Sequence, residues 1–444
     1  MHPIMSLRSL SANEKAVVSA LLRLRTGASQ AELARSMADP PSQPTLSRAM
    51  AQLMNKGLVL KTGTTRNARF ELVPAAVRFA TRPDLRPEAP YDPARIAGYE
   101  PNVSTWLPAA ARERMAAAAA RVEHRLNAST YSRSIAERFL IDLSWASSHL
   151  EGNTYDQLST EALIRYGQAA SGHDLAEATM ILNHKAAIGR LLERQEAGDG
   201  SRIPDPAEAF RTHALLMNGL MDFGDLGRIR RGSVRVSSTS YRPADDPVRL
   251  GLDLADLLAK ARSTRDPFEA SFLLVAGLPY LQAFGDGNKR MGRLLCNVPL
   301  LAAGLPPLSF LGVDQTAYIS GLIVFYETAE PELLGEALAA GYEVSAPSYQ
   351  AAIASPRRPR PIELAERPRL AAAVREIVRG GVHGHEAIEA AARASLSGLP
   401  SESREDAARV VVAMIEGLSP ESGVLYDLED AEVARYLARE GRSG

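Results

Sequence analysis

Cysteine and lysine are both scarce in this chain of 444 residues. Cys296 is the only cysteine, and lysine accounts for six of the 51 basic residues. A single cysteine excludes a disulfide framework and any zinc site built from several cysteines. We interpret the excess of arginine over lysine as a property of genome composition, and it carries no functional conclusion.

Long apolar runs and a strong net charge are absent as well. No stretch of about 18 apolar residues occurs, and the N-terminal sequence MHPIMSLRSLSANEK lacks the apolar segment of a signal peptide. The net charge is −1, so there is no overall attraction to nucleic acid or membrane, and any basic patch must be local. We therefore expect a cytoplasmic protein that contacts no membrane.

The length predicts several domains, because one hydrophobic core rarely serves more than about 250–300 residues. Hydrophobic residues make up 45% of the chain and charged residues 23%, which is typical of a globular protein. Changes of pattern along the sequence predict a mainly α-helical fold in four parts: an N-terminal unit over 1–76, a proline-rich arm or linker over 77–108, a helical domain over 109–354 and a small helical unit over 355–444.

The predicted helical domain contains five segments with apolar residues at three- and four-residue spacing, which is typical of amphipathic helices. These segments are 110–126, 133–150, 175–195, 205–221 and 246–262. Residues 233–243, SVRVSSTSYRP, alternate instead and predict a short strand or hairpin.

The N-terminal unit has the pattern of three short helices followed by a hairpin. Ser29 and Glu32 have capping-box spacing at the start of the second helix, and Pro44 suits the first turn of the third. LVLKTGTTRNARFELV then alternates around a polar tip. This order resembles a winged helix-turn-helix domain.

Such a domain places its third helix in the major groove of double-stranded DNA and its wing on phosphates. An alternative is a winged helix that serves only protein docking or dimerisation. We favour DNA binding because polar side chains occupy the groove-facing positions and the wing tip is basic. The matching residues are Thr45, Ser47, Arg48 and Gln52 on the third helix, and Lys61, Arg66 and Arg69 on the wing.

The stretch LPYLQAFGDGNKRMGRLLCN, residues 278–297, places turn-forming residues directly before a helical pattern. The N-terminus of a helix presents free backbone N–H groups and a positive dipole end, which suit an anionic phosphate. Lys289, Arg290 and Arg293 add positive charge there, and Asp286 supplies a carboxylate of the kind that Mg²⁺ uses beside phosphates. An ordinary loop with surface arginines is the alternative.

This stretch resembles the motif of the Fic family, His-Pro-Phe-x-Asp-Gly-Asn-Gly-Arg-x-x-Arg. Gln282 stands at the position of the histidine, and Lys289 stands at that of the second glycine. The segment SSHLEGN is similar to the inhibitory-helix motif of the family, and further similar pieces occur in the right order over roughly residues 100–350. The matching residues are Phe284, Asp286, Gly287, Asn288, Arg290 and Arg293 in the first motif, and Ser147, Glu151 and Gly152 in the second.

The resemblance implies a Fic-type helical domain with a β-hairpin flap at 233–243, where a target protein would lie. It also implies ATP or another nucleotide as ligand, with Mg²⁺ at Asp286. Glu151 is expected to pair with Arg293 and to block the γ-phosphate; an ordinary solvated glutamate is the alternative. The phosphates are expected at Asn288, Lys289, Arg290 and Arg293.

Two departures from the motif put the transfer reaction in doubt. In Fic transferases the histidine takes a proton from the target hydroxyl, which then attacks the α-phosphate of ATP. Gln282 has no titratable nitrogen, so general-base assistance of roughly 10²–10⁴-fold is missing. Lys289 is similar to the lysine of the Doc branch, which transfers the γ-phosphate but keeps its histidine. The chain matches neither active pattern.

Other titratable residues are not expected to replace the base. In the C-terminal unit, His383 and His385 lack further ligands nearby, so we expect a solvated loop rather than a metal site. Near the Fic-like motifs we expect packed or surface histidines, and tyrosines of the core and the flap; these residues are His149, His184, His213, Tyr241 and Tyr280.

We expect a ligand-responsive transcriptional regulator in which the Fic-type domain binds a nucleotide and the winged helix binds DNA. One alternative is an unorthodox protein nucleotidyltransferase (AMPylase) or phosphotransferase that uses ATP. Another is an interaction scaffold that uses neither site. Partner contact or a homodimer is the most that residues 355–444 support.

Overall fold

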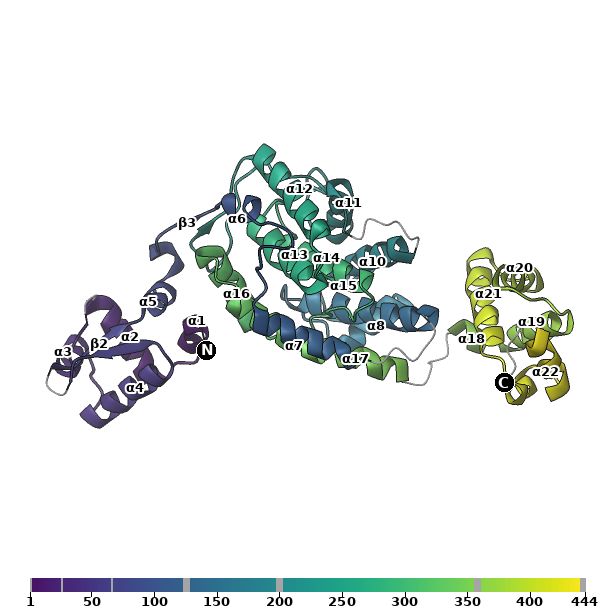
Figure 1. Ribbon diagram of the computed structural model, residues 1–444, viewed down its shortest axis with the longest axis horizontal. Coiled ribbons are helices and arrows are strands. Elements are labelled where there is room, and N and C mark those ends of the chain that lie inside the picture. The colour runs from purple at the N-terminus through teal and green to yellow at the C-terminus, as the bar shows by residue number, and fades with distance from the viewer. Residues whose placement is uncertain are drawn as a thin grey trace. The chain divides into compact units, whose positions relative to one another are not determined.

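The structure of the protein is a computed structural model that describes residues 2–24, 27–64, 67–122, 128–196, 203–354 and 361–439. The chain divides into two compact units, Met1–Ala354 and Ser355–Gly444, which are considered separately below. Both are built from helices, with four short strands among the described residues (Figure 1). The predicted fold class, mainly α, is confirmed.

The N-terminal elements form a small module with its own core, to which Leu33, Leu46 and Phe70 belong. The capping box predicted at Ser29 and Glu32 is present, and β1 pairs with β2 in antiparallel register. The predicted order of three helices and a hairpin is thus found, preceded and followed by one further helix. The elements are α1 (Pro3–Arg8), α2 (Ala12–Leu24), α3 (Gln30–Ser36), α4 (Gln43–Asn55), β1 (Val59–Thr62), β2 (Arg69–Leu72) and α5 (Pro74–Ala80).

The arm that follows is attached to the helical domain by backbone hydrogen bonds. It contains η2 (Pro83–Leu85), β3 (Ala89–Pro90) and α6 (Ala94–Ala97). Strand β3 pairs in parallel with β4 (Tyr241–Arg242), and the N–H of Tyr91 donates to the carbonyl of Arg242 at 2.8 Å. The arm therefore supplies the partner strand of the segment that precedes α12.

The hairpin that was one alternative for residues 233–243 is not formed. Only Tyr241–Arg242 of this segment is a strand, and its partner is the arm rather than a neighbouring part of the segment. The side chain of Tyr241 gives the reason, since it is buried and its hydroxyl donates to the carbonyl of Tyr280 at 2.6 Å. The end of the segment is thereby fixed to the core of the domain.

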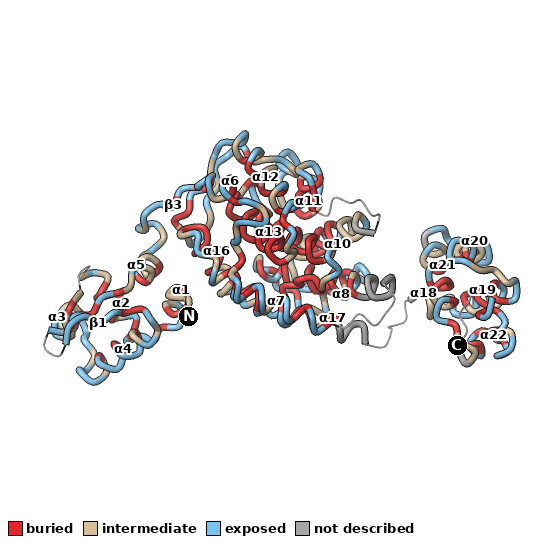
Figure 2. The backbone as a smooth tube through the Cα atoms, viewed as in Figure 1, coloured by how far each residue is buried: buried red, intermediate tan, exposed pale blue. Residues whose placement is uncertain are grey.

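Eleven helices form the helical domain in the described residues, and the five predicted from spacing appear as α7, α8, α10, α11 and α12. Helix α13 lies at the centre, where the other helices surround it, and every residue from Phe268 to Leu281 is buried (Figures 1 and 2). A helix that is apolar on all sides needs such a position. The helices are α7 (Ala109–Ala120), α8 (Ala128–His149), α9 (Gln157–Tyr166), α10 (Leu175–Glu196), α11 (Pro206–Met217), α12 (Pro247–Ser263), α13 (Pro267–Leu281), α14 (Asn288–Leu295), α15 (Asn297–Ala302), α16 (Gln315–Thr328) and α17 (Glu332–Ala354).

Glu327, near the end of α16, joins the N-terminal module, the arm and the segment before β4. Its carboxylate is fully buried and accepts hydrogen bonds from Arg78 of α5 at 2.7 Å and from Arg86 of the arm at 2.9 Å. It also accepts from the hydroxyl of Thr239 at 2.7 Å and from the N–H of Ser240 at 3.0 Å. One carboxylate thus ties four separate pieces of chain together.

The second unit is a bundle of short helices around a separate core that includes Val374, Val411 and Tyr436. No helix in the described parts of the chain combines the length and the apolar character that a membrane span needs. The elements of this unit are α18 (Pro361–Ala365), α19 (Arg367–Arg379), α20 (His385–Ser395), α21 (Ser401–Glu416), η3 (Pro420–Tyr426) and α22 (Asp430–Arg439).

Candidate phosphate-binding site

The loop between α13 and α14 contains two residues with left-handed backbone, Gln282 (φ 50°) and Gly287 (φ 78°). A side chain at Gly287 would be strained by this φ, and its Cβ would lie 2.8 Å from Sδ of Met217. Glycine is therefore required where α14 begins. No side chain caps this helix start, and the first backbone N–H groups of a helix lack partners within the helix.

The amide of Gln282 is used in hydrogen bonds at both ends. Its Nε2 donates to the carbonyl of Pro279 at 2.7 Å, and its Oε1 accepts from Nδ2 of Asn288 at 3.1 Å. Its own carbonyl accepts from Nε of Arg230 at 2.7 Å. Gln282 is thus part of the structure of the loop, and its amide has no group that takes up a proton near neutral pH.

His213 of α11 packs against the loop. The ring of His213 stacks on Phe284 with 4.0 Å between centroids, and its Nε2 donates to the carbonyl of Asp286 at 3.1 Å. Its Nδ1 accepts from the N–H of Gly227 at 3.0 Å, which fixes the tautomer. Burial lowers the pKa of His213 to about 4, so the ring is neutral at pH 7. Of the two alternatives expected for His213, a packed or a surface histidine, the structure shows the packed one.

Arg293 lies fully buried against the end of α8. Its Nε donates to Oγ of Ser147 at 2.9 Å, and its Nη2 donates to Oε1 of Glu151 at 2.6 Å. The hydroxyl of Ser147 lies 2.8 Å from Nε2 of His184, whose Nδ1 is 2.8 Å from the carbonyl of Met180. Burial lowers the pKa of His184 to about 3, so the ring is neutral at pH 7 and its Nε2 accepts a hydrogen bond from the hydroxyl of Ser147. The predicted pairing of Glu151 with Arg293 is confirmed.

Lys289 gives Glu151 a second cationic partner. The Nζ of Lys289 lies 3.0 Å from Oε2 of Glu151, while Oε1 faces Arg293. Burial alone would raise the pKa of Glu151, but the charges of Arg293 and Lys289 outweigh it and lower the value to about 2. Glu151 is therefore a fully ionised carboxylate clamped between two cations, and Gly152 (φ 95°) turns the chain directly after it.

Arg290 pairs with the other carboxylate of the site. Its Nη2 donates to Oδ2 of Asp286 at 2.8 Å, while Oδ1 of Asp286 accepts from the N–H of Gly287 at 2.5 Å. Three guanidinium nitrogens, Nε and Nη1 of Arg290 and Nη1 of Arg293, are buried and have no acceptor among the described residues. Buried donors without acceptors are costly, so these nitrogens suit the oxygens of a ligand.

Asp286 is exposed, at 64% of its side chain, and no group of three or more possible metal ligands occurs in the described residues. A lone exposed carboxylate fits Mg²⁺ that is mainly held by phosphate oxygens and water. It does not fit a metal held by protein groups alone.

The structure brings together all of the residues predicted for the phosphate and inhibitory positions. It gives two of the predicted DNA-binding residues internal partners instead: Ser47 accepts from Gln30 at 2.6 Å, and Arg69 donates to the carbonyl of Gly27 at 2.7 Å. Thr45 is half-buried and forms a hydrogen bond with Ser42. Arg66 lies outside the described residues. The predicted DNA-binding residues that are exposed on α4 and β1 are Arg48, Gln52 and Lys61.

Three contributors to the site were not predicted: Arg230, the contact of Lys289 with Glu151, and the hydrogen-bonded chain from Arg293 through Ser147 to His184. Arg230 is buried and anchors the loop, but the sequence GRIRRG does not distinguish it from its exposed neighbours. A chemical rule was available only for Lys289, because a lysine beside a buried carboxylate is expected to pair with it.

The candidate site thus combines a helix that begins after a glycine, three cationic side chains and the half-buried carboxylate of Glu151. Residues 203–300 match the family model described as the Fic/DOC family. The chain therefore contains a Fic/DOC family domain, and that match includes the loop and α14 but not Glu151.

Two curated relatives are similar to the central part of the chain. The protein adenylyltransferase fic-1 of Caenorhabditis elegans is 27% identical over 180 residues, and the protein adenylyltransferase Fic of Nematostella vectensis is 29% identical over 178 residues. Each similarity covers 39% of this chain. The matched region spans only 34% and 40% of the lengths of those relatives.

Two solved structures resemble the chain at lower similarity. Fic-1 from C. elegans (residues 134–508) has a TM-score of 0.47 at 20% identity, with 55% of this chain and 72% of that chain covered. A Fic family protein from Desulfovibrio desulfuricans has a TM-score of 0.46 at 23% identity, with coverages of 63% and 82%.

Proposed function

We propose that this protein is a nucleotide-responsive DNA-binding regulator whose Fic-type domain binds nucleotide phosphates and transfers no group efficiently. The observation that carries the binding is the set of buried, acceptor-free guanidinium nitrogens on Arg290 and Arg293. A phosphate oxygen would satisfy these donors with charge-assisted hydrogen bonds. Mg²⁺ bound with the phosphates would meet Asp286.

Glu151 acts in this proposal as a removable substitute for phosphate. Its two oxygens take the charge of Arg293 and Lys289, so an incoming phosphate competes with a carboxylate that is already ionised. Ligand binding then requires the end of α8 to release Glu151. This release is the conformational change by which a nucleotide would alter the rest of the protein.

The absence of transfer follows from the two hydrogen bonds of the Gln282 amide. A general base must reach the proton that it removes, and Gln282 is bound to Pro279 and Asn288 and cannot hold a proton in any case. The buried histidines do not replace it, because His184 and His213 each use both ring nitrogens in the scaffold.

DNA binding is proposed for the N-terminal module. Residues 1–76 contain ten basic and four acidic residues, although the whole chain has a net charge of −1. The exposed Arg48 and Gln52 lie on α4, and the exposed Lys61 lies on the hairpin, in the order of a winged helix-turn-helix. A local excess of positive charge favours a polyanionic partner.

Calorimetry with ATP and Mg²⁺ tests the nucleotide site. We expect weak binding by the natural chain and roughly tenfold tighter binding by the Glu151→Gly variant, because the competing carboxylate is gone. Glu161→Gly, another glutamate on a helix of the same domain, is the control. No binding by either the natural chain or the Glu151→Gly variant at millimolar ATP would contradict the proposal.

Electrophoretic shift on genomic fragments tests the DNA-binding half. Lys61→Ala should weaken binding to all sequences, whereas Gln52→Ala should change which sequences are preferred. Arg409→Ala, an exposed arginine of the second unit, is the control of equal charge. Absence of any shift at low salt would reject DNA binding and leave the nucleotide site untouched.

The second candidate is a protein adenylyltransferase, which the names of the curated relatives favour. Incubation with labelled ATP, Mg²⁺ and cell lysate separates the two functions. We expect no labelling by the natural chain, and labelling by the triple variant Gln282→His, Lys289→Gly, Glu151→Gly. Strong labelling by the natural chain that is lost in Gln282→Ala would establish an unorthodox transferase instead.

A further inference from the structure

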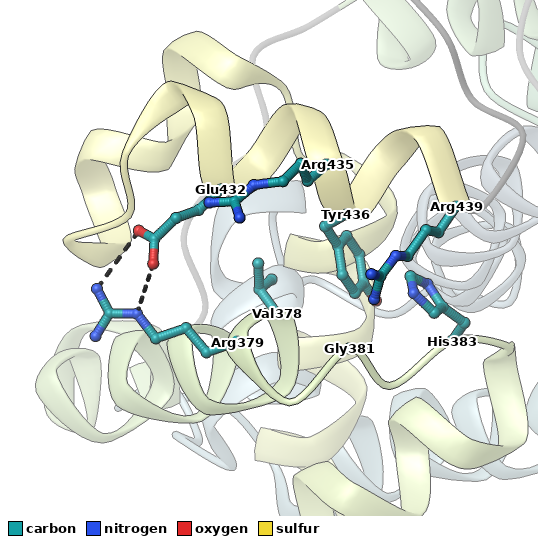
Figure 3. A pocket seen from close by; sticks show the side chains of 8 residues that line it. All are labelled: Val378, Arg379, Gly381, His383, Glu432, Arg435, Tyr436 and Arg439. Atoms are coloured by element: carbon teal, nitrogen blue, oxygen red, sulfur yellow. Dashed lines mark hydrogen bonds and ion pairs between the residues drawn. The ribbon is translucent and has the colours of Figure 1, made fainter.

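The second unit contains a pocket of about 200 Å³ that no function has yet been given. It lies between the end of α19, the turn at Gly381 and one face of α22 (Figure 3). Its size is below the ~300–1,000 Å³ that is typical of sites for drug-sized ligands. A small ligand is therefore the only kind that this pocket encloses.

One face of α22 supplies most of the lining. Glu432, Arg435, Tyr436 and Arg439 are spaced at three and four residues, so they share one side of the helix. In Figure 3 the guanidinium group of Arg435 lies beside Glu432, and that of Arg439 lies near Tyr436 and His383. The apolar residues Val433 and Leu437, together with Tyr436, belong to the core of the unit. The side of α22 that lines the pocket is thus the charged side, next to the apolar side that packs in the core.

The charges that line the pocket do not balance. Arg379 of α19 and Glu432 neutralise each other, at 3.1 and 3.5 Å between their atoms (Figure 3). Arg435 and Arg439 form no ion pair among the described residues, and the one hydrogen bond of the Arg435 side chain, to the carbonyl of Ala431, uses only Nε. Two guanidinium groups four residues apart repel each other, and a bound anion would relieve this repulsion.

The arginines are not needed to complete the neighbouring helix end. Helix α19 ends with the N–H of Gly381 on the carbonyl of Val378 at 3.1 Å and that of Val382 on the carbonyl of Ile377 at 3.2 Å. Gly381 adopts the left-handed backbone (φ 62°) that this ending requires. The carbonyls of Ile377 and Val378 are therefore satisfied by backbone.

A stacked aromatic pair forms a firm wall. The rings of His383 and Tyr436 lie 4.5 Å apart at 25°, and the hydroxyl of Tyr436 donates to the carbonyl of Val382 at 2.6 Å. In Figure 3 the guanidinium group of Arg439 lies beside this pair. A fixed wall next to exposed guanidinium groups suits a compact anion that is held from one side.

We propose that this pocket is a binding site for a small phosphate-bearing anion, in which Arg435 and Arg439 contact the phosphate oxygens. Arginine forks match phosphate geometry with two parallel hydrogen bonds each. The ligand is either a free phosphate compound or the phosphate end of a nucleotide, and the shared chemistry is the multiply charged phosphate group.

Hydrogen–deuterium exchange with mass spectrometry on the full chain tests the site, because it reports on each segment separately. Inorganic diphosphate should slow exchange in peptides that cover Gly381 to His383 and α22. The double variant Arg435→Ala, Arg439→Ala should lose this protection, and Arg409→Ala should keep it. The affinity should fall at least tenfold in the double variant.

A parallel titration with ADP separates the two sources of phosphate. Protection by diphosphate alone supports a free phosphate compound, and protection by ADP, with or without diphosphate, supports a nucleotide. No protection by either ligand at 10 mM, or equal protection in the double variant, overturns the proposal. Because the readout is confined to residues 378–439, it does not depend on the nucleotide site around Glu151.

Discussion

In the proposed function Lys289 has two successive partners. It contacts Glu151 before a nucleotide binds, and it contacts phosphate after Glu151 has been released. In the structure it contacts Glu151, with 3.0 Å between Nζ and Oε2. Removal of the lysine therefore loosens the internal anion and also removes a cation from the open site. The two effects oppose each other in the natural chain, but only the second remains once Glu151 is absent.

We predict that Lys289→Gln weakens ATP binding by roughly tenfold in the Glu151→Gly background and by threefold or less in the natural chain. The difference is a coupling free energy within the ~0.5–3 kcal/mol usual for residues in contact. Calorimetry measures this coupling free energy on the natural chain, the two single variants and the double variant. Lys15→Gln is a control with the same change of charge. Equal effects in both backgrounds would show that Lys289 does not hold Glu151.

The buried histidines make stability depend on pH. Burial lowers the pKa of His184 to about 3 and that of His213 to about 4, so both stay neutral in the folded chain. An unfolded histidine takes up a proton below about pH 6.5, which favours unfolding as the pH falls from there toward 4. Each histidine then costs up to about 1.4 kcal/mol of stability per pH unit.

We predict that the free energy of unfolding in urea falls between pH 7 and pH 5, and that His213→Phe reduces this slope. The variant keeps the ring that stacks on Phe284 but cannot titrate. Urea unfolding at both pH values measures the effect. A slope that His213→Phe leaves unchanged would mean that other groups cause it.

At the scale of the element, the start of α14 depends on one glycine. Gly287→Ala places a Cβ in left-handed backbone and 2.8 Å from Sδ of Met217, so we expect a loss of stability of about 1–3 kcal/mol and weaker ATP binding in the Glu151→Gly background. Gly285→Ala is the matched control, because its Cβ would meet only Met221, at 3.7 Å. Equal effects of the two substitutions on the melting temperature would contradict this account.

The helices were predictable because their spacing and caps are local. The capping box of Ser29 and the amphipathic spacing of α12 depend on residues within a few positions of each other. The loop and its pairing with Glu151 followed from resemblance to a family motif, since no spacing rule connects positions 142 residues apart. The strand partner of Tyr241 was missed for the same reason. The alternation over 233–243 yields a strand only at Tyr241–Arg242, and the partner lies in the distant arm.

At the scale of the whole first unit, Glu327 connects the N-terminal module to the helical domain. Removal of its charge leaves Arg78 and Arg86 without their buried partner, which typically costs about 3–5 kcal/mol. We predict that Glu327→Gln lowers the urea midpoint and exposes the arm to trypsin at Arg82 and Arg86. Glu330→Gln is the control, because Glu330 is an exposed carboxylate only three residues further along the chain.

Resistance of the arm to trypsin in Glu327→Gln, with an unchanged urea midpoint, would show that the carboxylate is dispensable for this connection. Cleavage of the arm without a change in the helical domain would instead show that the module and the domain unfold separately. The two measurements together distinguish a local joint from one on which the whole unit depends.

The carboxylate of Glu151 also determines how ligands of this protein can be found. In the proposed function the site already contains one anion that offsets part of its positive charge, so a bound nucleotide replaces the ion pairs of Glu151 with its own. The gain in melting temperature depends on the surplus of the new contacts over the old ones. Thermal-shift screening of the natural chain will therefore miss true ligands, and the Glu151→Gly variant is the protein on which a compound library should be screened.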